Sequence, residues 1–459
     1  MGDTATNLHV CTMMQNAHIM SEGEGSEYKT WLLDYVDGWM ERAEAQGGLL
    51  PDNVGLGGIV GEEMDGRWYG SSYGWSWPHG FYNIAMASLL AGVSCFQLTG
   101  DPKYLELPRT QISTIMKLGK VEALDMSQMS LAEHWTPQMS AIAGHTIADE
   151  DGDASVTTGG STLATRERVA ASAWKATTTP TFVVPYRIMD SGWFDYQPMA
   201  PMYPAMLWNC CGEDVDMESL RTIRDNEPFD WRGVYSFRTK EDAGHEPPWI
   251  CFLQGENPAF PVEILQAAMT QVYRRSEQIR QDATVGSDGR YDRSMPARGH
   301  DIHHWQVLNP VTTEALIMLT LGAPQMLYNG GLLLAPLRYF DQRRSRPGLP
   351  KDVAALVSRV TQSELEVTLC NLSAVNAATM IIQAGTLCEH SFTTVGFSEV
   401  VTPWPSTVGD YAAPDVQSRV REVGVDGPTF TLELPPGTQV LLTIGLQRNV
   451  APPTYAFPF

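Results

Sequence analysis

The hydrophobic pattern of this sequence changes near residue 330, and that change constrains the fold more than any other feature. Before it, apolar residues recur at helical spacing, as in "SEYKTWLLDYVDGWMERAEA". After it, short β-branched runs such as "ELEVTLCNLS" and "TQVLLTIGLQ" partly alternate and end at Gly, Pro or Asn. We therefore expect a helical domain over 1–330 and a domain of antiparallel strands over 331–459.

Several helices have well-marked ends. The segment 26–46 carries an apolar stripe that includes Trp31 and Trp39, and Gly47 with Gly48 predicts its C-cap. The segment 81–100 is apolar on nearly all sides, which predicts a buried inner helix. Asp101 and Pro102 then form a helix start signal after a short turn, so the two segments predict an αα-hairpin.

Four further helices are expected, at "PMYPAMLWNCC", "DVDMESLRTIRD", "FPVEILQAAMTQVYRRSEQIRQD" and "NPVTTEALIMLTLGAP". Between about 127 and 180 periodicity is lost in a Thr-, Ser-, Ala- and Gly-rich stretch, which predicts a low-complexity insertion. We assign no chemistry to that insertion.

Charge and composition exclude several functions. A net charge of −22 and a pI near 4.8 argue against nucleic-acid and anionic-membrane partners, which need a cationic surface. No apolar run reaches the ~18 residues of a membrane span, and "MGDTATNLHVCTMM" lacks the features of a signal peptide. The chain as written is expected to be soluble and cytoplasmic, or secreted or periplasmic if a leader has been lost. Its seven scattered cysteines predict buried thiols and no disulfide framework.

The hairpin turn "LTGDPKYLEL", the aromatic-rich loops and the closing strands "LELPPGTQVLLTIGL" resemble the (α/α)-toroid carbohydrate-active enzymes. These are six-hairpin glycosidases and polysaccharide lyases with a toroid and a β-sandwich. The resemblance implies an α+β multidomain protein, in which an (α/α) toroid precedes a C-terminal antiparallel β-sandwich, the domain order of the lyases. The helical segments are fewer than a closed ring needs, so the toroid is expected to be incomplete.

The stretch "GRWYGSSYGWSWPHGFY", residues 66–82, carries six Trp and Tyr rings among glycines and serines that disfavour helix and strand. Such a loop suits a sugar subsite, because the flat C–H faces of sugars stack on aromatic rings. We predict Trp68, Trp75 and Trp77 as substrate contacts. The alternative is that several of these rings are core residues.

The same loop could carry out β-elimination of a uronate-containing polymer. That reaction needs a base for the C5 proton, an acid for the leaving oxygen and a group that neutralises the carboxylate. His79 with Tyr69 or Tyr73 could fill the first two roles. The alternative is that His79 only caps the helix that begins at Gly80.

The stretch "RGHDIHHWQVLNP" groups three further candidate histidines. We predict His303 or His304 in catalysis, His300 in substrate contact and Arg298, together with Asn209, as carboxylate ligands. A divalent metal at His300 with His303 or His304 is the less favoured alternative, because the spacing is not a recognised zinc signature. No other cofactor is expected.

A second aromatic segment, "YRIMDSGWFDYQPMAPMYPAMLWNCC", is predicted as a loop before a helix, with Trp193 and Tyr196 as substrate contacts. Two such loops that converge would form a cleft. Asp195 in this segment, paired with Glu62 or Glu63 of the first, would allow hydrolysis by two carboxylates instead of elimination.

The sequence therefore favours an enzyme that cleaves an acidic polysaccharide by β-elimination. A glycoside hydrolase on the same fold and a non-catalytic glycan-binding protein are the alternatives. The expected partner is an oligo- or polysaccharide, and a homo-oligomer is compatible with the sequence.

Overall fold

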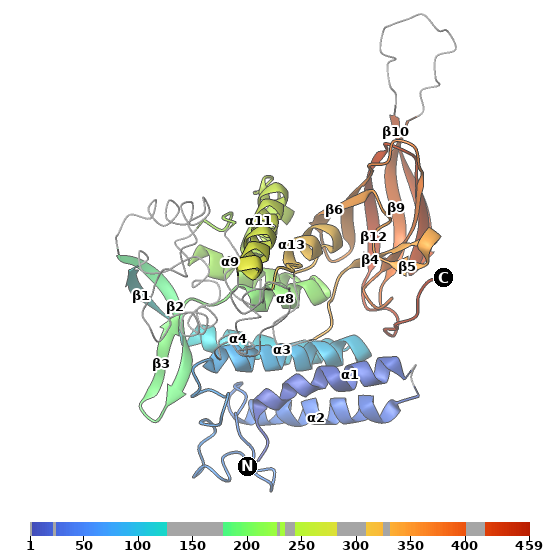
Figure 1. Cartoon of the computed structure of the whole chain (residues 1–459). Coiled ribbons are helices and arrows are strands. Elements are labelled where there is room, and N and C mark those ends of the chain that lie inside the picture. Colours follow the sequence, from blue (N-terminus) through green and yellow to red (C-terminus); the bar gives the residue numbers. More distant parts are fainter. Residues whose placement is uncertain are drawn as a thin grey trace, which may run out of the picture.

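The computed structural model describes residues 2–21, 24–125, 178–226, 230–234, 244–281, 309–324, 331–400 and 418–459. Over these ranges a helical N-terminal part is followed by antiparallel sheets (Figure 1). The predicted α+β class and the order of its two parts are confirmed at this level. All seven cysteines are free thiols, in agreement with the expectation that no disulfide framework exists.

Helix α3, Gly80–Thr99, is the centre of the helical part. Every residue from its start to Leu98 is buried, which confirms the predicted inner helix. It contacts η1 (Ala5–Val10), α1 (Cys11–Met20), α2 (Ser26–Ala45), α4 (Glu106–Lys117) and α8 (Met202–Cys211). Among the described residues, α3 is the one helix long and apolar enough to span a membrane, and it is wholly enclosed by the protein.

The helices at the N-terminal side follow the predicted signals. Helix α2 buries Leu32, Val36 and Trp39 as expected, whereas Trp31 at the edge of the stripe is 40% exposed. The C-cap is also confirmed: Gly47 is left-handed with φ 71°, and the amide of Gly48 donates to the Ala43 carbonyl at 2.8 Å.

The predicted αα-hairpin is confirmed as well. Gly100 ends α3 in the left-handed region with φ 68°, and the Asp101 carboxylate then accepts a hydrogen bond from the Lys103 amide. The turn continues through the 3-10 helix η2 (Pro102–Leu105) into α4.

The other predicted helices are present as α8, α9 (Asp214–Asp225), α11 (Phe260–Gln281) and α13 (Glu314–Leu316), the last continued by a π-turn over Ile317–Leu321. Of the α-helices in the described ranges, α1 and α10 (Glu246–Leu253) were not predicted. Helix α1 has no apolar stripe in "CTMMQNAHIM", and α10 carries two prolines in its first turn, so neither shows the usual pattern.

A three-stranded antiparallel sheet corrects one prediction. It consists of β1 (Lys120–Asp125), β2 (Thr178–Met189) and β3 (Gly192–Gln197), in that order. The second aromatic segment is thus a β-hairpin and not a loop. Gly192, at φ 102°, allows the tight turn between β2 and β3. The sequence did not reveal this turn, because aromatic residues follow the glycine directly. The predicted insertion lies outside the described residues from 126 to 177.

The C-terminal part contains two antiparallel sheets. One has the strand order β10-β9-β12-β7-β6 and the other β11-β8-β4-β5. The strands are β4 (Leu337–Asp341), β5 (Arg346–Pro347), β6 (Val353–Val360), β7 (Glu364–Asn371), β8 (Ala378–Ala384), β9 (Ser391–Val400), β10 (Ser418–Gly427), β11 (Thr429–Leu434) and β12 (Gln439–Gln447), with the 3-10 turn η7 (Gln342–Arg344) after β4. The β-rich runs expected from the sequence are confirmed as strands.

The two sheets share apolar contacts. Side chains of β7 alternate between buried and half-buried positions, as expected for a strand with one face in a core. Phe392 of β9 lies 5.2 Å from Phe430 of β11 between ring centroids, so a pair of rings joins the two sheets.

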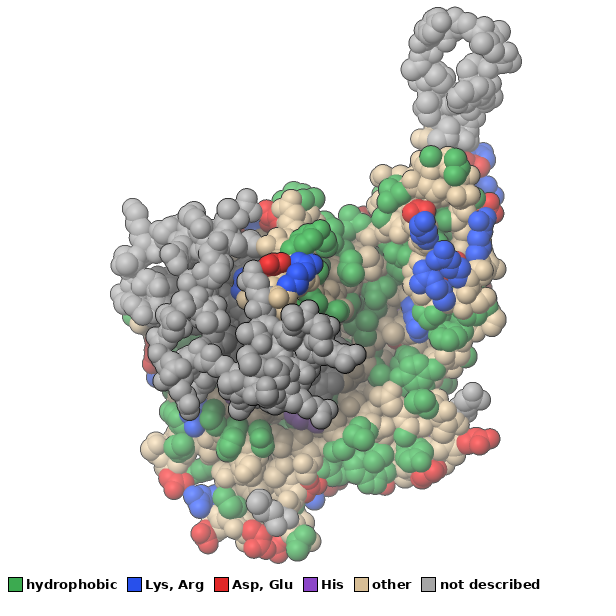
Figure 2. Space-filling view, in the orientation of Figure 1, with side chains coloured by type: hydrophobic (Ala, Val, Ile, Leu, Met, Phe, Trp, Pro, Cys, Tyr) green, Lys and Arg blue, Asp and Glu red, His purple; other side chains and the backbone are tan. Residues whose placement is uncertain are grey.

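Figure 2 shows Lys and Arg side chains gathered on the sheet part. Several sheet arginines, such as Arg419 with Glu399, have acidic partners.

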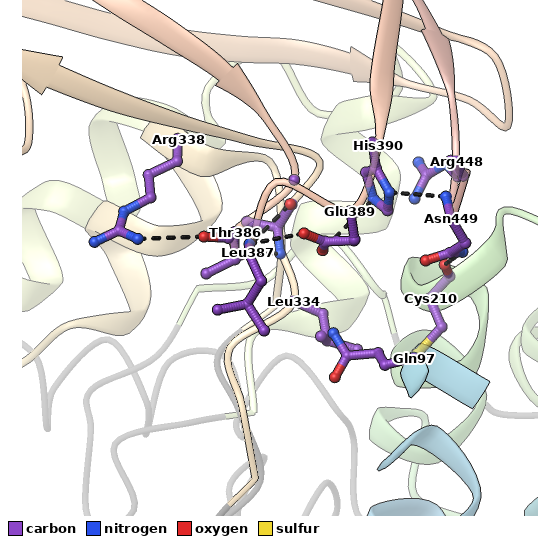
Figure 3. A network of polar contacts seen from close by, with 12 residues as sticks. Gln97, Cys210, Leu334, Arg338, Thr386, Leu387, Glu389, His390, Arg448 and Asn449 are labelled. Atoms are coloured by element: carbon purple, nitrogen blue, oxygen red, sulfur yellow. Dashed lines mark hydrogen bonds and ion pairs between the residues drawn. The ribbon is translucent and has the colours of Figure 1, made fainter. Parts of the chain in front are cut away.

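Polar side chains join the sheets to the helices. The Arg448 guanidinium donates to the Asn209 carbonyl of α8 at 2.9 Å, and to the Thr361 and Gln362 carbonyls between β6 and β7 at 2.9 and 3.1 Å. Asn449 beside it donates to the Cys210 carbonyl at 3.5 Å (Figure 3). One short segment after β12 therefore makes hydrogen bonds to both parts.

A substitution at Gly80 tests how tightly α3 is fixed at its start. A Cβ there would lie 1.9 Å from the Tyr186 carbonyl oxygen, and φ is +32°. We expect Gly80→Ala to lower the free energy of unfolding by at least about 3 kcal/mol, measured by denaturant titration. Gly66→Ala is the matched control, since Gly66 is also left-handed but its Cβ would meet nothing within 4 Å. It should lose only about 1 kcal/mol. Equal losses would contradict the steric account.

Glu389, at the junction of the two parts, generates a pH prediction. The side chain is 2% exposed, and burial raises its pKa from 4.5 to about 7. Because the folded pKa lies above the unfolded one, the contribution of this group to stability is largest below pH 4.5 and is lost as pH rises toward 7. Between pH 5 and 8, the free energy of unfolding of Glu389→Gln should therefore rise relative to wild type, by at most about 3 kcal/mol. The exposed Glu433→Gln is the control, and a flat difference for both would contradict the prediction.

Candidate functional site

The aromatic loop, residues 66–82, packs against the β2–β3 hairpin at the start of α3. The Trp193 ring of the hairpin lies 5.4 Å from Trp75 and 6.2 Å from Trp68, and these two loop rings lie 6.0 Å apart, all between ring centroids. The Ser76 hydroxyl donates to the Ile188 carbonyl at 2.7 Å. The structure thus brings together the two aromatic segments that the sequence singled out.

A buried carboxylate, Asp52, organises the loop. It is 0% exposed and accepts hydrogen bonds from the amides of Trp75, Gly70 and Ser71 at 2.7, 3.1 and 3.2 Å. Burial raises the pKa of Asp52, against the opposing effect of these N–H groups. Sequence analysis missed Asp52, because nothing in "LLPDN" distinguishes it from a surface acid.

The rings of the loop divide into buried and exposed ones. Trp75 is fully buried, and its indole N–H donates to the Leu50 carbonyl at 2.8 Å. It is a core residue, and its predicted role as a substrate contact is corrected, because it offers no ring face to a ligand. Trp68 is half-buried against the Tyr69 ring. Tyr73 and Trp77 are 58% and 37% exposed, with ring centroids 4.9 Å apart.

The exposed ring of Tyr73 depends on an unusual backbone. Tyr73 has φ +61°, a left-handed conformation that costs a non-glycine residue about 1–2 kcal/mol. Its carbonyl accepts a hydrogen bond from the Asn83 side chain of α3 at 2.9 Å, and Asn83 is only 6% exposed. The conformation is therefore held from inside the protein, and the ring is directed toward solvent beside Trp77.

His79 follows Trp77 by two residues, and Arg187 contacts the same loop at Ser76. His79 occupies the N-cap position of α3, as the alternative interpretation expected. Its side chain, however, makes no capping hydrogen bond. Arg187 of β2 approaches Gly80, since a Cβ there would lie 2.9 Å from its Cγ. The guanidinium donates to the Ser76 carbonyl at 3.0 Å and lies 4.7 Å over the Phe194 ring. Within the described part of the chain it has no acidic partner. Sequence analysis missed it inside the apolar run "VVPYRIM".

Tyr69 is tied to the turn of the hairpin. Its hydroxyl donates to Asp190 at 3.0 Å, and Arg67 lies 3.4 Å from the same carboxylate oxygen. The hydrogen bond to Asp190 raises the pKa of Tyr69, whose phenol already carries its proton at neutral pH. The proton needed by a general acid is therefore present.

The carboxylates predicted for hydrolysis are not brought together by any contact of the described residues. Glu62 is exposed and accepts a hydrogen bond from the Gly57 amide at 2.8 Å, and Glu63 is exposed next to it. Asp195 lies on β3 with φ +57° and accepts a hydrogen bond from the Gln197 side chain at 2.7 Å.

Two other predicted contacts are placed differently from expectation. Asn209 is 3% exposed in α8 and donates to the Leu334 carbonyl at 2.7 Å, at the junction with the sheets. This corrects its role as a carboxylate ligand beside the loop. The Lys120 ammonium covers the Tyr196 ring at 3.6 Å from its centroid. Arg298, His300, His303 and His304 lie outside the described residues.

A buried cluster of a histidine and two acids was missed by sequence analysis. Nδ1 of His245 lies 2.7 Å from Oε2 of Glu314, and both side chains are fully buried. Burial, followed by the nearby Glu314 carboxylate, raises the pKa of Glu246 well above its usual value. In the sequence, only the adjacent His245 and Glu246 in "HEPPW" could have indicated this cluster. Arg275 donates to the Asn309 carbonyl at 2.6 Å, where the segment with the predicted histidines re-enters the described chain.

A possible metal cluster is already occupied by a cationic side chain. Ligand atoms of Cys211, Glu213 and Asp216 lie within 4.8 Å of one another. The Arg109 guanidinium donates to Asp216 and Glu213 at 2.6 and 2.8 Å and lies 3.5 Å from the Cys211 sulfur. Arginine therefore balances this negative charge, and a metal ion would have to displace it.

Comparison with known proteins identifies a family but no activity. Residues 1–151 and 145–317 match the family described as "Domain of unknown function (DUF8034)", so the match extends over more than half of the chain. The chain belongs to the DUF8034 family. No curated protein matches it.

Two solved structures share limited similarity with this DUF8034 protein. One is an α-L-arabinofuranosidase from Thermotoga maritima in complex with arabinose, with 15% identity, TM-score 0.16 and coverage of 22% of this chain and 21% of that one. The other is the arabinose-bound α-L-arabinofuranosidase MgGH51, with 18% identity, TM-score 0.17 and coverage of 23% and 17%. The chain thus spans about a fifth of their length, and the similarity carries no argument about fold or activity.

The role of Asp52 in this DUF8034 protein can be measured. Asp52→Asn keeps the shape of the side chain but places an N–H group against backbone N–H donors. We expect a loss of about 1–3 kcal/mol in the free energy of unfolding, with a red shift of tryptophan fluorescence as the loop loosens. Asp190→Asn is the control, because that carboxylate is 75% exposed, and it should change stability by less than about 0.5 kcal/mol. An unchanged Asp52→Asn variant would contradict the assigned role.

Proposed function

We propose that this protein is a carbohydrate-active enzyme that binds an acidic polysaccharide and cleaves it by β-elimination. The observation that carries the proposal is the exposed ring pair of Tyr73 and Trp77, in a loop that also contains His79 and that Arg187 contacts at Ser76. Two adjacent exposed rings suit the apolar face of a sugar. A guanidinium without an acidic partner suits a sugar carboxylate.

The architecture is consistent with this proposal. Helical hairpins in the N-terminal part and two sheets with shared apolar contacts in the C-terminal part agree with a partial (α/α) toroid followed by a β-sandwich. We propose this arrangement as the finer description of the fold. Membership of DUF8034 assigns no activity, so the function rests on the site alone.

The residues around the ring pair can be given roles in the elimination. Arg187 would bind the uronate carboxylate and thereby acidify the C5 proton. His79, or His303 or His304, would take that proton, and the hydroxyl of Tyr69 or Tyr73 would donate one to the leaving glycosidic oxygen. The C–O bond breaks as the C4–C5 double bond forms, so no water is consumed.

A hydrolase is the second candidate, and the buried acids favour it. A carboxyl group whose pKa is raised by burial, as for Glu246, is the form a glycosidase uses as its general acid. Glu314, which raises that pKa further, is the second carboxyl group of the cluster. Glu62 or Glu63 with Asp195 stays the pair predicted from sequence.

The test is incubation with a panel of uronate-containing and neutral polysaccharides. We expect ultraviolet absorbance of the unsaturated product from a uronate polymer. Tyr73→Ala and Trp77→Ala should each lower kcat/KM about 10-fold or more, because a stacking contact contributes on the order of 1 kcal/mol or more. Trp31→Ala is the control, since Trp31 is a similarly exposed ring (40%) on α2, away from the loop.

The alternatives give different results in the same assay. Reducing ends without that absorbance would replace elimination by hydrolysis. Oligosaccharide binding in calorimetry without any product would indicate a glycan-binding protein. If none of the polysaccharides binds to the protein, the proposed function is rejected.

A further inference from the structure

A small cavity lies at the junction of helices and sheets, at the opposite end of α3 from the aromatic loop. Both parts of the protein contribute to its wall: Phe96, Gln97, Asn209, Cys210, Leu334, Ala335, Glu389, His390 and Asn449. Figure 3 shows the sheet residues Glu389, His390 and Asn449 on one side and Gln97 and Cys210 of the helices on the other.

Two buried amide side chains bring hydrogen-bonding atoms to this cavity. Asn209 uses its Nδ2 on the Leu334 carbonyl, and Gln97 uses its Oε1 to accept from Gln15. Among the described residues, Asn209 Oδ1 and Gln97 Nε2 have no hydrogen-bond partner, although the two side chains are only 3% and 7% exposed. One acceptor and one donor therefore remain at the cavity, and leaving either unsatisfied costs free energy.

Two residues between β8 and β9, His390 and Glu389, line the same cavity. His390 Nδ1 accepts from the Asn449 amide at 3.0 Å, so the neutral ring carries its proton on Nε2. Burial lowers the pKa of His390 to about 3, which keeps the ring neutral. Glu389 uses Oε2 to accept from the Leu387 amide at 2.7 Å. Its Oε1 lies 3.9 Å from His390 Nε2, too far for a direct hydrogen bond.

We infer that this cavity binds one ordered water molecule that links the helical part to the sheets. The water accepts from Gln97 Nε2 and donates to Asn209 Oδ1. These two partners are enough for a buried water molecule, and the cavity has room for about one. This inference is independent of the proposed function.

A metal cation fits the same cavity less well. The N–H groups of Gln97 and His390 would both oppose a positive charge. The Arg448 guanidinium, bonded to the Asn209 carbonyl at 2.9 Å, already supplies one beside the cavity. The chemistry of the wall therefore selects a neutral molecule that both donates and accepts.

The first test is a high-resolution crystal structure of the unmodified full chain, grown without small alcohols. We expect a single density peak at hydrogen-bond distance from Gln97 Nε2 and Asn209 Oδ1, with the scattering and distances of water. No peak, a cation with metal-ligand distances or a larger molecule would each overturn the inference.

The second test measures coupling between two side chains through the shared water. Gln97→Met and Asn209→Leu preserve size but remove the polar groups. If both hold the same water, the loss of Tm in the double variant is clearly smaller than the sum of the two single losses. Ser88→Ala, a buried substitution on α3 away from the cavity wall, is the control partner for Gln97→Met and should give additive losses. Additive losses for Gln97→Met with Asn209→Leu would contradict a shared ligand.

Discussion

The burial of α3 on all sides is the constraint on which the rest of the structure depends. A helix that is apolar around its whole circumference must be covered in every direction, and here η1, α1, α2, α4, α8 and β2 cover it. Its two ends are where buried polar groups become necessary, because the chain must leave the core there. The aromatic loop lies at the first end, and the junction with the sheets lies at the second.

At the first end, buried polar groups determine which aromatic rings can meet a ligand. Asp52 and Asn83 bind backbone groups of the loop, while Trp75 fills the core under it. With Trp75 enclosed and the Tyr73 backbone held in a left-handed conformation, Tyr73 and Trp77 remain outside. Binding surfaces held in this way lose little conformational entropy when a ligand arrives.

At the second end, polar side chains link the two parts, beside the apolar packing of Met318 and Leu319 with strand β6. Arg448 donates hydrogen bonds to carbonyl groups of both parts. Glu389 and His390 lie next to each other at the same junction. Because burial moves the pKa of Glu389 into the neutral range, this junction titrates close to physiological pH. The acid pair Glu246 and Glu314, with His245, forms a second buried titratable cluster in the helical part.

The sequence by itself determined the features that depend on local periodicity and local caps. These include the α+β order, the inner helix α3, the Gly47 and Gly48 cap, the hairpin turn at Asp101 and most strands after residue 337. It also marked the two aromatic segments, because their composition is unusual along the chain.

Only the tertiary structure decided which of those residues are available for function. Trp75 and Tyr73 stand two positions apart in similar surroundings, yet one is fully buried and the other is 58% exposed. Asn209 donates a hydrogen bond to the Leu334 carbonyl, and Asp52 accepts hydrogen bonds from the aromatic loop. Arg187 approaches Gly80 from a strand more than a hundred residues away in the sequence. The burial of a side chain and the identity of its hydrogen-bond partner depend on contacts between distant segments. No pattern within a short window of sequence specifies those contacts.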